Sequence, residues 1–63
     1  MNQRQIEDAA GIDDAVAAHI MKGETVNARF AMDVLRLQVR SYDPGGFALI
    51  KASVEACKKE MGS

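Results

Sequence analysis

A chain of 63 residues with 48% hydrophobic and 27% charged residues has the composition of one small globular domain, which excludes a disordered segment. The formal charge of −1 at pH 7 argues against a protein whose affinity rests on neutralising nucleic-acid phosphates. No run of about 18 apolar residues and no apolar leader is present, so we expect a cytoplasmic protein that does not engage a membrane.

Cysteine and histidine usage limits the ways in which this chain can be stabilised. A domain this short buries only about 60% of its unfolded surface, so close helix packing or a partner must supply stability. The single Cys excludes an internal disulfide, and one Cys with one His falls short of the roughly four ligands of a structural zinc site. We therefore predict no metal and no other cofactor.

The first predicted helical region spans residues 3–22 and contains a break near Gly11. Gly11 is typical of a helix C-cap, and Asp13 is typical of the N-cap of a following helix. The alternative is one unbroken helix, which would place Asp13 in the middle of the apolar arc formed with Ile6 and Ile20, at a cost in desolvation. The sequence therefore favours a break or a bend at Gly11.

The second predicted helix spans residues 25–42, after a stop at Lys22-Gly23 and a cap at Thr25. At about 100° per residue, one side of it carries Val26, Phe30, Val34 and Leu37. A second, broader side carries Ala28, Ala31, Met32, Leu35, Val39 and Tyr42, and the polar stripe is limited to Arg29, Asp33, Arg36 and Arg40. One neighbour cannot cover an apolar arc of roughly two-thirds of the circumference, so we expect cover from two directions, by the N-terminal helix or by a second copy.

The third predicted helix spans residues 46–61, after a turn at Asp43-Pro44-Gly45-Gly46. Its apolar seam consists of Phe47, Ile50, Val54, Cys57 and Met61. The predicted fold is all-α, a small three-helix chain in which the last two helices form an antiparallel hairpin. In this hairpin Phe30, Val34 and Leu37 are expected to pack on Phe47, Ile50 and Val54.

Residues that could perform chemistry are few, and each has a structural interpretation. His19, which has no partner within its motif, is interpreted as a partly exposed residue that favours the negative end of its helix. Cys57 is interpreted as a small buried hydrophobe of the seam. Without a nucleophile, base and orienting group in one motif, we predict no catalytic residue and no enzymatic activity.

The predicted function is that of a small protein-binding regulator or inhibitor that acts as a helical homo-oligomer, an expectation that follows from size and patterning and from no motif. Partner contacts are assigned to the exposed residues with shape and charge, which are Arg29, Arg36, Arg40 and Tyr42. The residues assigned to the core or to the dimer interface are Phe30, Val34, Leu35, Leu37, Val39, Phe47, Ile50, Val54 and Cys57.

Two alternatives from other classes remain. A helix ending at Lys22-Gly23, a tight turn and an Arg-bearing helix share the outline of a helix-turn-helix DNA-binding regulator that would use Arg29, Arg36 and Arg40. The acidic overall charge and Asp33 within the basic stripe disfavour it. The other alternative is a small-ligand binder whose arginines face an anionic group in a pocket between subunits.

Overall fold

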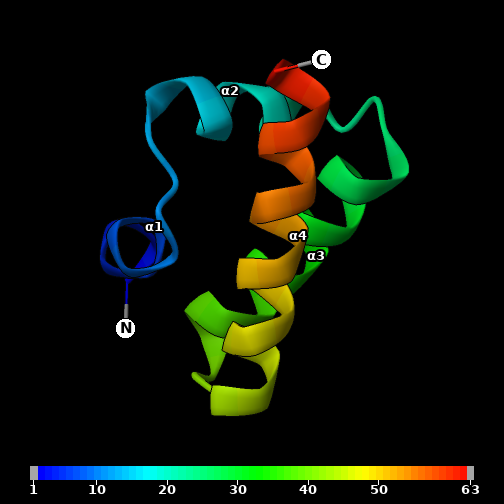
Figure 1. Cartoon of the computed structure of the whole chain (residues 1–63). Helices are drawn as coiled ribbons and strands as arrows, with labels where there is room; N and C mark the ends of the chain where they lie inside the picture. Colours follow the sequence, from blue (N-terminus) through cyan, green and yellow to red (C-terminus); the bar gives the residue numbers. More distant parts are fainter. Residues whose placement is uncertain (1, 63) are drawn as a thin grey trace.

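The computed structural model describes residues 2–62, and all of its regular structure is helical, as the sequence predicts. Met1 and Ser63 lie outside the described residues. The four helices are α1 (Gln3–Ala10), α2 (Asp14–Lys22), α3 (Val26–Arg40) and α4 (Pro44–Gly62). In Figure 1, α3 and α4 lie side by side, α2 passes near the C-terminal end of α4, and α1 lies at the left, where it contacts α3 and α4.

Local capping interactions separate α1 from α2. Gly11 adopts a left-handed conformation with φ 80°, and its N–H reaches the carbonyl of Asp8 while the next N–H, of Ile12, reaches that of Glu7. This pair of bonds is the Schellman motif, for which glycine is favoured because it has no Cβ. Asp13 then accepts a hydrogen bond of 2.9 Å from the Val16 N–H and caps α2. The chain therefore breaks at Gly11 and restarts at once, so the N-terminal region forms two separate helices, and residues 2–62 contain four helices where the sequence predicted three.

The start of α4 differs from the predicted turn over residues 43–46. Asp43 caps the helix by accepting the Gly46 N–H at 2.8 Å, Pro44 occupies the first helical position, and both following glycines lie within the first turn. The prediction of a helix from residue 46 was wrong by two residues, because proline at the first position of a helix loses no hydrogen bond. The preceding helix ends at Arg40, two residues before its predicted end at residue 42, so the connection to α4 is short and runs from Ser41 to Asp43.

Gln38 is a buried polar residue that connects the end of α3 to the start of α4. Its side-chain oxygen accepts the Asp43 N–H at 3.0 Å, and its amide nitrogen lies against Gly46. At the other end of the pair, Thr25 and Asn27 at the start of α3 hydrogen-bond to Glu60 near the end of α4. These contacts at both ends show that α3 and α4 run in opposite directions.

The hydrophobic core draws on all four helices and on the segment between α1 and α2. Its buried members are Ile6, Ala10, Ile12, Val16, Ile20, Ala28, Ala31, Val34, Leu35, Ile50, Val54 and Cys57. Met32 and Phe47 pack against this cluster and are partly buried. Of the predicted core or interface residues, the structure buries five, which are Val34, Leu35, Ile50, Val54 and Cys57.

The rest of the predicted apolar surface of α3 is exposed, which corrects the expected packing. Phe30 is 46% exposed and Leu37 is 61% exposed, so neither is buried against α4. Val39 is 37% exposed on the other flank. The reason is geometric: α1, α2 and α4 converge on one arc of α3, about 120° wide at 100° per residue, instead of covering two opposite sides. Leu35 is buried by this single-chain arrangement.

None of the helices within residues 2–62 combines the length and the hydropathy that crossing a bilayer requires.

Candidate functional site

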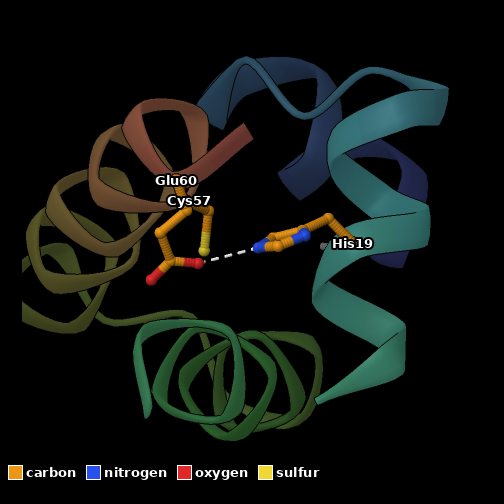
Figure 2. Close-up of side chains that lie close together, drawn as sticks. All are labelled: His19, Cys57 and Glu60. Atoms are coloured by element: carbon orange, nitrogen blue, oxygen red, sulfur yellow. Dashed lines mark hydrogen bonds and ion pairs between the residues drawn. The ribbon is translucent and has the colours of Figure 1, made fainter. Parts of the chain in front are cut away.

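Three side chains with different donor atoms meet where α2 and α4 approach each other. His19 extends from α2, and Cys57 and Glu60 extend from α4, so that one donor atom of each lies within 4.8 Å of the other two. Figure 2 shows the sulfur and the carboxylate on the same side, facing one ring nitrogen of His19. We call these three residues the His-Cys-Glu cluster. Within the cluster Cys57 is buried, whereas the His19 and Glu60 side chains are each 24% exposed.

The carboxylate of Glu60 is held by three donors from α2 and from the start of α3. His19 Nε2 lies 2.8 Å from Oε2, Thr25 Oγ1 donates to the same oxygen at 2.9 Å, and Asn27 Nδ2 donates to Oε1 at 2.8 Å. Thr25 serves twice, because its hydroxyl oxygen also accepts the Ala28 N–H and so caps α3. The orientation of Glu60 is therefore defined by both of these helices.

These contacts set the protonation of Glu60, and burial sets that of Cys57. The hydrogen bonds from His19, then Thr25, then Asn27 lower the pKa of Glu60 below its ordinary value of 4.5, so the group is a carboxylate at neutral pH. An ionised carboxylate can only accept, so His19 Nε2 donates in this state. Burial, and after it the charge of Glu60, raises the pKa of the Cys57 thiol, which is therefore protonated and a weak nucleophile at neutral pH.

The lowered pKa of Glu60 predicts that acid weakens the fold through this residue. Because the folded protein binds the proton less readily than the unfolded chain, the contribution of Glu60 to stability is complete above about pH 4.5 and disappears as the pH falls through the lower folded-state pKa. Thermal unfolding of wild type and Glu60→Gln between pH 7 and pH 3 measures this effect. The gap in Tm between the two proteins should narrow on acidification, and a gap that stays constant with pH would contradict the role given to the carboxylate.

A second candidate site is a groove of about 390 Å³ between α3 and the two N-terminal helices, α1 and α2. Its floor and walls are mostly apolar, with two cationic residues at consecutive turns of α3. The lining comes from three helices and consists of Gln3, Met21, Met32, Leu35, Arg36, Val39 and Arg40. We call it the methionine groove, because Met21 of α2 and Met32 of α3 both line it.

The structure separates the four residues that the sequence assigned to partner contacts. Arg36 and Arg40 both line the methionine groove. Arg29 instead donates its Nε–H to the carbonyl of Gly23 and so supports the turn between α2 and α3. Tyr42 lies beside Phe47, with ring centroids 5.8 Å apart, at the α3–α4 connection. Only two of the four predicted contact residues therefore share a concave surface.

Sequence reasoning missed the part played by Glu60. The spacing of Cys57 and Glu60 by three residues places them on one face of a helix, and that signal is visible in the sequence. Their meeting with His19 is not visible, because His19 and Glu60 lie 41 positions apart along the chain. His19 is partly exposed in the last turn of α2, as expected, and its partner Glu60 lies far outside its local motif, where nothing in the sequence indicates it.

Comparison of the chain with models of known protein families, with curated proteins and with solved structures gives no match.

Proposed function

We propose that this chain is a small non-enzymatic protein-binding module, a regulator or inhibitor, that receives an acidic, apolar segment of a partner protein in the methionine groove. The observation that supports it is the combination of an apolar concave surface with Arg36 and Arg40 on one rim. Amphipathic helices bind hydrophobic grooves through apolar anchors spaced along one face. Methionine side chains adapt their shape to such anchors, which suits Met21 and Met32 to this task.

The charge of the rim selects the chemistry of the partner. Arg36 and Arg40 are exposed, lie one helical turn apart, and make no ion pair with another described residue, so both guanidinium groups can contact carboxylates of a bound segment. Opposite charges across an interface speed association and exclude unsuitable partners. The occupant we propose therefore carries Asp or Glu beside Leu, Phe or Met on a single helical face.

We further propose that two copies associate through the outer stripe of α3, which consists of Val26, Phe30 and Leu37. These three side chains lie within about 40° of each other on the helix and are exposed in the single chain. A second copy would cover them by a symmetric contact of the kind most homodimers use. Sedimentation velocity at micromolar concentration should give the mass of a dimer, and a monomer across that range would refute this assembly.

The DNA-binding alternative has less support in the structure. The residues at the start of α3, where a recognition helix reads bases, are engaged within the chain: Thr25 and Asn27 donate to Glu60, and Arg29 donates to Gly23. The Glu60 carboxylate at this end of α3 would also repel phosphates. Protein binding in the methionine groove is therefore the better-supported function.

The proposal can be tested without knowledge of the partner. A displayed library of random helical peptides is selected for binding to the immobilised protein. Enriched peptides should combine acidic residues with large apolar residues at helical spacing. Their affinity should fall about tenfold or more, equivalent to about 1.4 kcal/mol, for Arg36→Glu/Arg40→Glu. The matched control is Lys51→Glu/Lys59→Glu, which changes the net charge equally on α4, outside the groove.

The outcomes separate the candidate functions. Equal losses in both double variants would show that net charge and not the groove governs binding, which overturns the proposal. The assignment would move to the DNA-binding alternative if no peptide is enriched and the protein binds a DNA duplex in a salt-dependent way. Arg36→Glu/Arg40→Glu should then abolish the binding of DNA. Binding of a small fatty-acid-like anion in preference to every peptide would transfer it to the ligand-binding alternative.

A further inference from the structure

The His-Cys-Glu cluster has a feature that a hydrogen-bond network alone does not require. It brings an imidazole nitrogen, a thiol sulfur and a carboxylate oxygen to within 4.8 Å of one another, although α2 and α4 are separated by more than twenty residues of chain. In Figure 2 the sulfur of Cys57 and the carboxylate of Glu60 approach the same nitrogen of His19. Convergence of three donor atoms on one point is the geometry of a ligand set.

We propose that His19, Cys57 and Glu60 bind a zinc ion at the junction of α2 and α4, with the fourth coordination position open to water. Histidine nitrogen, cysteine thiolate and carboxylate oxygen are the three donor types that zinc accepts in proteins. Three protein ligands with one open position is a recurring arrangement for this ion. The mixture of a soft sulfur with nitrogen and oxygen disfavours magnesium and calcium, which prefer oxygen ligands alone. The proposal replaces the sequence-based expectation of no metal, which counted Cys and His but not the carboxylate.

The distances require only a small rearrangement on binding. Bond lengths of about 2.0–2.3 Å in a tetrahedral site separate neighbouring ligand atoms by roughly 3.3–3.7 Å. The His19–Glu60 contact of 2.8 Å would therefore open by roughly half an ångström, while the sulfur would approach by about 1 Å from within the 4.8 Å limit. Rotation of the partly exposed His19 side chain can supply these shifts, while Cys57 is fully buried and Glu60 is held by its hydrogen bonds.

The surroundings of Glu60 resemble the outer shell of a metal site. Thr25 and Asn27 donate to the two carboxylate oxygens and fix their direction toward His19. Outer-shell hydrogen bonds of this kind orient ligands and commonly change metal affinity about 10–100-fold. The ion would take the position that the hydrogen bond between Nε2 and Oε2 occupies in the metal-free chain.

Proton release accompanies binding. Cys57 must lose its thiol proton, and His19 Nε2 must be unprotonated, with any remaining N–H on Nδ1. Together the thiolate and the carboxylate would supply two negative charges to a divalent cation. Zinc affinity should therefore rise with pH, by about tenfold per pH unit for each proton released.

Titration of the metal-free, fully reduced chain with Co²⁺ tests the proposal, because Co²⁺ is a coloured substitute for zinc. We expect the visible bands of a tetrahedral site and a near-ultraviolet thiolate-to-metal charge-transfer band, both removed when Zn²⁺ displaces Co²⁺. Zinc should also raise the Tm, since binding to the folded state alone stabilises it. Absence of the charge-transfer band at millimolar Co²⁺ would overturn the proposal.

Three variants separate a metal site from a purely structural cluster. Cys57→Ala removes the sulfur but leaves the His19–Glu60 hydrogen bond, so it should remain folded and lose both the charge-transfer band and the zinc-induced rise in Tm. Glu60→Gln should weaken zinc binding about tenfold or more, whereas Glu55→Gln, an exposed control on the same helix, should leave it unchanged. Zinc affinity that is equal in wild type and Cys57→Ala, or reduced equally by both Glu variants, would contradict the site. None of these residues lines the methionine groove, so this test and the peptide-binding test fail independently.

Discussion

Truncation of Ile50 to Ala is expected to lower the free energy of unfolding by about 2–5 kcal/mol. Ile50 has no exposed surface and lies in the cluster that joins all four helices, so the truncation leaves a cavity that rigid neighbours cannot fill. A domain of this length has roughly 3–9 kcal/mol of stability in total. Loss of this one side chain should therefore bring the protein close to unfolding at room temperature, as urea denaturation followed by circular dichroism would show.

The neighbouring residue provides the matched control. Leu49 is of the same size but 53% exposed, and Leu49→Ala should change the free energy of unfolding by only about 0.5 kcal/mol. Both variants remove an aliphatic side chain from the same turn of α4, so helix propensity cannot account for a difference between them. Similar urea midpoints for the two variants would contradict the packing of this face of α4 against the core.

Replacement of Gly46 by Ala should destabilise the protein by about 1–3 kcal/mol, although alanine normally stabilises a helix relative to glycine. A Cβ at this position would overlap the side-chain amide nitrogen of Gln38. Gln38 cannot easily move away, because it is only 3% exposed and its oxygen accepts the Asp43 N–H. Displacement of the amide would sacrifice that hydrogen bond, so either response costs stability.

Gly45→Ala tests the same argument one residue earlier. There an added Cβ would lie 3.4 Å from an Asp43 carboxylate oxygen, an ordinary contact, and no other atom of the described residues is close. We expect Gly45→Ala to be neutral or to stabilise the fold by up to about 1 kcal/mol, since it reduces the freedom of the unfolded chain. Opposite signs for the two glycines in thermal unfolding would support the placement of Gln38. Stabilisation by both substitutions would show that the amide is not held against α4.

The helix boundaries of this protein are encoded locally, and this is why they could be anticipated. The bonds that end α1 at Gly11 and start α2 at Asp13 join residues no more than five positions apart, and the same is true of Thr25 with Ala28. The exceptions are the end of α3, predicted at residue 42 and found at Arg40, and the start of α4, where Pro44 indicates both a turn and the first position of a helix. Local chemistry is ambiguous there, and the structure places the helix start earlier than predicted.

The two candidate sites could be predicted only in fragments. The spacing of Arg36 and Arg40 by four residues puts them on one face of α3, and that of Cys57 and Glu60 by three residues puts them on one face of α4. What lies opposite each pair depends on how the helices pack. Met21 shares a groove with the arginines, and His19 reaches the carboxylate, only because α2 packs against both α3 and α4.

The sequence by itself determined that the chain is helical, where its first two helices separate, and which face of α4 is buried, because propensity, capping and periodicity act over a few residues. Tertiary structure decided how much of α3 is covered. Three helices converge on one arc, so Leu35 is enclosed within a single chain while Phe30 and Leu37 are exposed. Periodicity indicates which side chains are apolar, but the number and direction of the neighbouring helices decide which of them lose contact with water.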